Sequence, residues 1–299
     1  MKITPLRTWL LLAGFLPLAS FANPTLLVHE TFADGNYTTA TQDGSGAYTS
    51  LDWAIRRTNG ANVSVGGGAL TLTSTATATG QIAAAQWRNS PAALTPGQYV
   101  SLNFDVSMST ALVNTFRIGI YNAHDDPNTV GTGGSTSTGY MAMLNFNPSA
   151  GGNYISLNER DPSVLINTVG FGMVGGPQSS GTSVFSTLSL YHLDFTLALL
   201  NENQLEVSMT ITGDGLSSPV AISYIDTPNA TTGMADMETY FNQIAFQNNS
   251  QNSPLSISNL RIEMGAVPIP EPSTYAMLMA LAALGLVALR RHRQNRSAA

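Results

Sequence analysis

The chain has 299 residues, of which 43% are hydrophobic and 10% charged, and its formal net charge is −6. It contains no Cys, which excludes disulfides, thiolate metal sites and thiol nucleophiles. Residues 24–266 hold six Arg, no Lys and seventeen acidic side chains. This balance argues against nucleic acid as a partner, because contacts to phosphates require basic clusters.

The N-terminal segment, residues 1–22, differs in composition from the rest. Lys2 and Arg7 form a positive start, and an apolar run follows at residues 9–18. The run ends in the small-x-small sequence Ser-Phe-Ala, which closes at Ala22. This pattern is typical of a secretory signal peptide. We therefore predict export through the secretion translocon and cleavage by signal peptidase after Ala22.

Residues 23–266 are predicted to form one body domain, whose apolar side chains alternate along many short segments. Residues 98–107 and 204–211 alternate most strictly, which is typical of half-buried antiparallel strands. About fourteen such segments predict an all-β fold, a two-sheet antiparallel sandwich of the jelly-roll type. The other predicted strands are residues 26–31, 53–57, 69–75, 81–87, 115–121, 140–145, 154–158, 165–170, 188–199, 220–224, 244–247 and 255–263.

Between the strands we expect long loops and one short helix. Residues 32–52 and 123–139 carry no strand signal, and loops of this kind are where binding usually takes place. Residues 234–241 place Met234, Met237 and Phe241 near helical spacing, which predicts the helix.

The body loosely resembles the concanavalin-like and laminin-G-like sandwich group. The likeness lies in an early Glu-Thr-Phe-Ala-Asp-Gly segment at residues 30–35, a central pair of long strands and the final segment at residues 255–262. The likeness supplies the sandwich fold but no ligand motif.

One segment is compared with the glucanases of that group, which carry a Glu-x-Asp-x-x-Glu strand motif with two carboxylates beside the glycosidic bond. Glu159 and Asp161 match its first half, but the second Glu is missing and Pro162 interrupts the strand. We interpret Glu159 and Asp161 as a solvated loop pair and predict no enzymatic activity. A divergent glycoside hydrolase is the weaker alternative.

Metal ligands are sparse in the body. Asp125, Asp126 and Asn128 form the best oxygen-rich cluster, and such oxygens suit Ca²⁺. The same residue types dominate turns, so a turn is the favoured interpretation and a calcium site the alternative. His192 and Asp194 share one strand face, but two ligands do not make a zinc site. No other cofactor is predicted.

Aromatic side chains are the remaining candidates for binding, because sugars stack on exposed rings. Core packing is the favoured role for an aromatic residue within a strand, and sugar stacking is the alternative for any that face outward. The candidates are Tyr48, Trp53, Trp87, Tyr121 and Tyr140.

The C-terminal segment, residues 267–299, has three parts in series. A Pro-rich stretch disfavours helix, an uncharged apolar run follows at residues 275–289, and a basic end comes last. As a helix the run spans roughly 22 Å, against about 30 Å of hydrocarbon, so it crosses a membrane only if the flanking arginines snorkel. The central residues of the stretch are Pro270, Glu271, Pro272 and Ser273, and the basic end includes Arg290, Arg291 and Arg293.

These three parts resemble the PEP-CTERM sorting signal of Gram-negative bacteria. The resemblance implies that an exosortase recognises the Pro-Glu-Pro element and removes the tail, so that the passage through the inner membrane is transient. The basic end is expected to stay in the cytoplasm, which leaves the body outside. An uncleaved membrane anchor is the alternative.

Taken together, these features predict an exported, non-catalytic surface or extracellular-matrix protein that associates with exopolysaccharide. The alternative is a lectin-like carbohydrate-binding module, with or without calcium. The envelope, the cell surface and the matrix are the expected destinations of the body.

Overall fold

The protein is described by a computed structural model in which most of the body and a few residues of the tail are placed. Contacts divide the chain into one compact unit, Asn23–Val267, and a second unit made of Met1–Ala22 and Pro268–Ala299. The described residues are 23–35, 40–56, 62–73, 81–87, 91–109, 115–124, 137–145, 155–160, 172–173, 189–214, 216–228, 237–248, 254–267, 280–285, 287 and 290.

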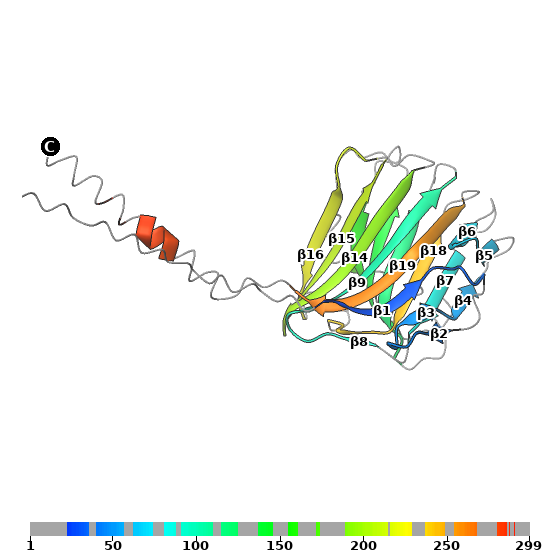
Figure 1. The fold of residues 1–299 in the computed structure, drawn as a ribbon, viewed down its shortest axis with the longest axis horizontal. Helices are drawn as coiled ribbons and strands as arrows, with labels where there is room; N and C mark the ends of the chain where they lie inside the picture. Colours follow the sequence, from blue (N-terminus) through cyan, green and yellow to red (C-terminus); the bar gives the residue numbers. More distant parts are fainter. Residues whose placement is uncertain are drawn as a thin grey trace, which may run out of the picture. The chain divides into compact units, whose positions relative to one another are not determined.

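The larger sheet of the compact unit has ten strands (Figure 1). Eight of them follow the order β16-β15-β14-β9-β19-β1-β3-β2, and β6 pairs with β19 and with β5. All pairs are antiparallel except β1 with β3. The strands are β1 (Thr25–Glu30), β2 (Thr41–Gln42), β3 (Tyr48–Ser50), β5 (Asn62–Gly66), β6 (Ala69–Thr73), β9 (Gln98–Met108), β14 (Leu190–Asn201), β15 (Gln204–Gly213), β16 (Val220–Asp226) and β19 (Leu255–Ala266).

The second sheet has seven strands in the order β13-β12-β11-β10-β18-β7-β4, all antiparallel. A two-stranded sheet pairs β8 with β17. These strands are β4 (Trp53–Arg56), β7 (Gln81–Gln86), β8 (Ala92–Ala93), β10 (Thr115–Asn122), β11 (Thr138–Asn145), β12 (Ile155–Arg160), β13 (Gly172–Met173), β17 (Tyr240–Phe241) and β18 (Gln243–Asn248).

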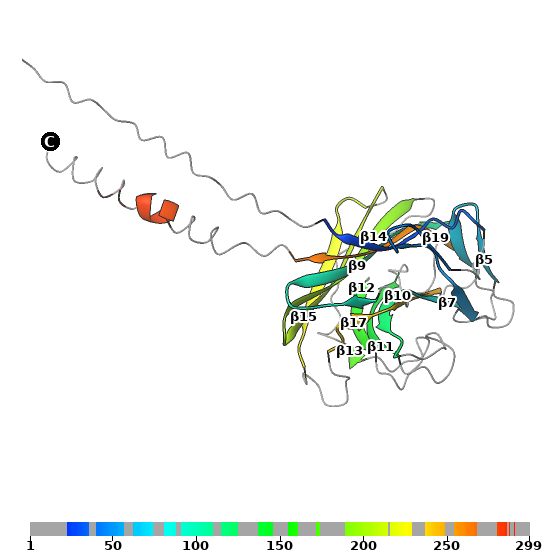
Figure 2. The same ribbon diagram turned by 60° about the horizontal axis from the view of Figure 1, so that its bottom comes forward.

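The two large sheets face each other and bury one continuous core between them (Figure 2). Phe246 of β18 lies near the middle of this core, where its ring centroid is 5.2 Å from that of Phe104, 6.2 Å from Phe116 and 5.9 Å from Trp53. Burial of each such side chain contributes about 1.5–3 kcal/mol. The strand pairing of these sheets confirms the predicted all-β, antiparallel class.

Alternation located the predicted strands well, including those with weaker patterns. The strands predicted at residues 98–107 and 204–211 are β9 and β15. The stretch at residues 32–52, expected to lack strands, contains β2 and β3, which are held by pairing, β3 to β1 and β2 to β3, rather than by their own pattern. The strand predicted at residues 165–170 lies outside the described residues.

The helix predicted at residues 234–241 is wrong over the part that the structure describes. Residues 237–239 are irregular and Tyr240–Phe241 form β17. The backbone here bonds to neighbouring segments instead of to itself: Leu94 N donates to Thr239 O over 2.9 Å, and Asn242 N donates to Tyr121 O over 3.0 Å. Tertiary pairing therefore overrides the helical spacing.

Most of the two terminal segments lies outside the described residues. This holds for the predicted signal peptide, residues 1–22, and for the Pro-Glu-Pro motif at residues 270–273. Residues 280–285 are helical. Within the described part of the chain, no helix combines the length and the hydropathy that a membrane crossing requires.

Candidate functional site

The outer face of the ten-stranded sheet is polar because its strands alternate. In β9 the side chains of Val100, Leu102, Phe104 and Val106 are buried in the core, so that those between them point outward. Register then places His192 and Asp194 of β14 opposite Asp105 and Asn103 of β9. The outward residues from the two strands are therefore neighbours, although they are far apart in sequence.

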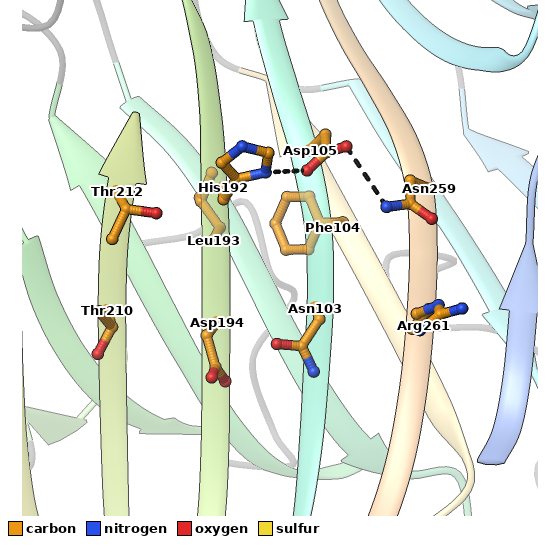
Figure 3. A pocket seen from close by; sticks show the side chains of 10 residues that line it. All are labelled: Asn103, Phe104, Asp105, His192, Leu193, Asp194, Thr210, Thr212, Asn259 and Arg261. Atoms are coloured by element: carbon orange, nitrogen blue, oxygen red, sulfur yellow. Dashed lines mark hydrogen bonds and ion pairs between the residues drawn. The ribbon is translucent and has the colours of Figure 1, made fainter. Parts of the chain in front are cut away.

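A shallow depression of about 360 Å³ opens on this face (Figure 3). At its centre, His192 Nδ1 and Asp105 Oδ1 are 2.5 Å apart. The side chain of His192 is 59% exposed and that of Asp105 is 17% exposed. The lining residues are Asn103, Phe104, Asp105, His192, Leu193, Asp194, Thr210, Thr212, Asn259 and Arg261.

A β-bulge shapes one wall of the depression. The register of β19 against β9 shifts between Ser258 and Arg261, and Asn259 within the shift has a positive φ of 50°. Asn tolerates this conformation better than most residues. Asn259 Nδ2 lies 3.5 Å from Asp105 Oδ2, so the bulge directs an amide toward the carboxylate that contacts His192.

The depression offers both donors and acceptors to a ligand. Its carboxylates accept hydrogen bonds, its guanidinium donates, and its amides and hydroxyls do both. The sequence pointed to His192 and Asp194, but not to Asp105, which is 87 positions from His192. Among the described residues, no group of three or more His, Asp or Glu is placed to hold a metal ion.

A second polar region lies at one end of the seven-stranded sheet, around the carboxylate of Glu238. Thr138 Oγ1 donates to Glu238 Oε2 over 2.5 Å and contacts His124 Nε2 at 2.6 Å. Asn122 Nδ2 also donates to Oε2, over 3.2 Å. The other oxygen, Oε1, accepts from the backbone N–H groups of Thr239 and Tyr240. Both carboxylate oxygens are thus used within the protein.

This network continues inward through Tyr140. Its hydroxyl accepts from Glu238 N over 3.2 Å and donates to Asp226 Oδ2 over 2.6 Å. Burial raises the pKa of Tyr140 far above its usual value, and the negative charges of Asp226 and Glu159 add to the effect. Burial also raises the pKa of Asp226, against the lowering effect of its hydrogen bonds from Tyr140 and from the Thr227 backbone.

Glu159 does not belong to a solvated loop, contrary to the prediction. It lies in β12, opposite Tyr140 of β11, and is only 4% exposed. The inward alternation of Ile155 and Leu157 continues through Glu159, because the strand extends to Arg160 before it ends. Asp161 lies outside the described residues, as do the calcium candidates Asp125, Asp126 and Asn128.

The five aromatic candidates are buried, as the favoured interpretation predicted, although Tyr121 packs in a separate cluster with Ile82 and Met141 rather than in the core between the sheets. Tyr48 and Trp53 are 5% and 3% exposed, and Trp87, Tyr121 and Tyr140 are fully buried. An outward aromatic residue that the sequence analysis missed is Tyr99 of β9. Its signal was present, since Tyr99 alternates with the inward Val100.

The tail matches a known sorting signal. Residues 268–294 match the family model described as the PEP-CTERM protein-sorting motif. The chain carries a PEP-CTERM sorting motif. The predicted resemblance of the tail is therefore confirmed, and the motif implies processing by an exosortase, export, and a cell-surface or extracellular location.

Solved structures similar to the compact unit share little sequence with it. One is the exoplasmic/lumenal domain of VIP36 bound to Ca²⁺ and Man3GlcNAc, with 8% identity and a TM-score of 0.43 over 74% of this chain and 88% of that chain. The PL-14 alginate lyase from Aplysia kurodai has 10% identity and a TM-score of 0.44 over 70% and 86%. A sialidase has 12% identity and a TM-score of 0.39 over 76% of this chain but only 18% of its own. No curated protein sequence matches the chain.

Proposed function

We propose that this is a non-catalytic surface or matrix protein whose β-sandwich, of jelly-roll type, binds polysaccharide through the outer face of the ten-stranded sheet. The depression around Asp105 and His192 carries the proposal. It presents donors and acceptors from β9, β14, β15 and β19 on one open surface. Sugars need this mixture, because each hydroxyl both donates and accepts.

Charge favours a neutral polysaccharide. Residues 24–266 contain seventeen acidic side chains against six Arg and no Lys. An anionic polymer would be repelled by such a surface, especially at low ionic strength. A polymer of uncharged sugars would meet no such barrier.

Delivery to that polymer follows from the two ends of the chain. We propose that residues 1–22 act as a signal peptide that signal peptidase removes during secretion through the translocon. The apolar run at residues 275–289 then passes through the inner membrane transiently, with Arg290, Arg291 and Arg293 on the cytoplasmic side. Exosortase cleavage at the Pro-Glu-Pro element releases the body.

Hydrolysis through Glu159, the carboxylate that the glucanase comparison singled out, is disfavoured because the interior carboxylates hardly reach solvent. Glu159 and Asp226 are 4% and 5% exposed, and Asp226 is bonded to the hydroxyl of Tyr140. A glycosidase must bring two carboxyl groups to the substrate. Release of reducing sugar that is abolished by Glu159→Gln would contradict the non-catalytic assignment.

Affinity electrophoresis tests the function. Full-length protein in mild detergent is run through gels that contain neutral polysaccharides (laminarin, xylan, mannan or dextran) or the anionic alginate. We expect retardation by a neutral polymer, reduced about tenfold by the double change Asn103→Ala and Thr210→Ala, since two lost hydrogen bonds are worth about 1–3 kcal/mol.

The matched control removes two exposed hydroxyls from another part of the same sheet. Thr41→Ala and Thr49→Ala break a hydrogen bond of 2.9 Å between exposed side chains. This variant should bind like the wild type. If no neutral polysaccharide retards the protein, the proposed function is wrong. Loss of binding in a calcium chelator would instead support the calcium-dependent alternative.

A further inference from the structure

The depression around His192 is one part of a longer track on the outer face. A second depression, of about 380 Å³, is lined by Ser107, Leu190 and Ser256 among others. Ser107 lies opposite Leu190 on β14 and opposite Ser256 on β19. The two depressions therefore follow each other along the same three strands, β9, β14 and β19.

At the other end of the track lies the ring of Tyr99. Register places Tyr99 between Gly265 of β19 and Ala198 of β14. A Cβ atom on Gly265 would come within 2.8 Å of the Tyr99 ring, so that the ring occupies the space of the absent side chain. Small neighbours on both sides leave no tall side chain beside the ring.

The groups along the track are suited to an uncharged ligand. Negative charge exceeds positive charge among the described side chains of β9, β14 and β19 that face outward along the track. The carboxylates are Asp105, Asp194 and Glu263, and the guanidinium is Arg261. Two of these carboxylates lie close enough to Tyr99 to raise its phenol pKa, after the larger effect of burial. A uronate or sulfate group would be repelled.

We infer that the ligand is the interior of an extended, neutral polysaccharide chain that lies along β9, from Tyr99 to Ser109 just beyond the end of the strand. This inference rests on the proposed polysaccharide binding. The ten residue steps of this track measure roughly 33 Å at about 3.3 Å each, which is the length of several sugar units. The phenol ring offers an apolar face for stacking, and Leu190, 40% exposed, supplies apolar surface toward the other end.

Chain length is the test. Full-length protein is titrated calorimetrically with β-1,3-glucan, β-1,4-glucan, xylan and mannan oligosaccharides of two, four and six units. For the series that binds, affinity should rise at least tenfold from the disaccharide to the hexasaccharide. Tyr99→Ala should lower hexasaccharide affinity about tenfold.

Tyr240→Ala is the matched control, because Tyr240 is 37% exposed on β17, away from the track. Two results would overturn the inference while the proposed function stands. One is a disaccharide that binds as tightly as the hexasaccharide, and the other is an unchanged hexasaccharide affinity in Tyr99→Ala. The absence of binding to every neutral oligosaccharide and polysaccharide would remove both. A dimer in light scattering that Tyr99→Ala dissociates would also overturn it, because the track would then hold a second copy.

Discussion

The outer face of the ten-stranded sheet and the network around Glu238 use the same chemical groups for different purposes. Each has a histidine next to a carboxylate, with hydroxyls and amides nearby. The two carboxylates are about equally exposed, 14% for Glu238 and 17% for Asp105. Glu238, however, accepts hydrogen bonds from two side chains and two backbone N–H groups, whereas Asp105, among the described residues, contacts only the exposed His192 and, over 3.5 Å, the amide of Asn259. The number of internal hydrogen bonds, rather than residue type, separates a structural network from a surface that can bind a ligand.

Removal of Glu238 should have the largest effect on stability. Glu238→Ala leaves the amide of Asn122, the hydroxyl of Thr138 and two backbone N–H groups without their acceptor. We expect the free energy of unfolding to fall by about 3 kcal/mol in urea titrations. The control is Glu206→Ala, a half-exposed carboxylate on β15, which should change it by less than about 0.5 kcal/mol. If both changes lowered the free energy of unfolding equally, the structural role of Glu238 would be contradicted.

The pH dependence of stability should show a smaller effect from Asp226. Its pKa is raised on folding, so that the folded state binds the proton more tightly than the unfolded state. The contribution to stability is present in full below the unfolded pKa of about 4 and is lost as pH rises through the folded pKa. We expect Asp226→Asn to remove this decline in the free energy of unfolding over that window, as measured by urea titrations at a series of pH values.

The control for this titration is Asp43, whose pKa is lowered mainly by hydrogen bonds from Ser45. Asp43→Asn should therefore remove a contribution of the opposite sign, one that is present above pH 4 and lost below it. A steeper decline with pH in Asp226→Asn than in the wild type would show that the buried carboxyl is not the group responsible.

The smallest change in stability is expected on the open face. His192→Ala removes an exposed partner of Asp105 and should alter the free energy of unfolding by less than about 0.5 kcal/mol. Polysaccharide retardation should nevertheless weaken, because the imidazole lines the depression. If His192→Ala destabilised the protein as much as Glu238→Ala, His192 would have a structural role. The distinction between the outer face and the Glu238 network would then be wrong.

The sequence predicted local structure better than contacts between distant segments. Alternation in β9 and β15 identified both strands and their inward side chains, but the outward Tyr99 was overlooked. It could not reveal that Asp105 meets His192, since that pair depends on the register of β9 against β14. The sorting tail was recognised because its signal is local and compositional.

The errors have related causes. The helix expected at residues 234–241 gave way to β17 because its backbone pairs with segments far away in sequence. Glu159 was taken for a loop residue because Pro162 follows it, although β12 continues through Arg160. Tyr140 of β11, Glu159 of β12 and Asp226 of β16 therefore come together in the interior. No local sequence pattern predicts this contact.

The position of β19 constrains when the domain can fold. β19 is the last strand of the body to be synthesised, yet it joins β1, β6 and β9, which come from the first half of the chain. Until residue 266 has been added, these three strands lack their common neighbour and the larger sheet cannot close. The timing of folding is thereby tied to the completion of the chain, and a premature stop before β19 leaves β1 and β6 without their connection to β9.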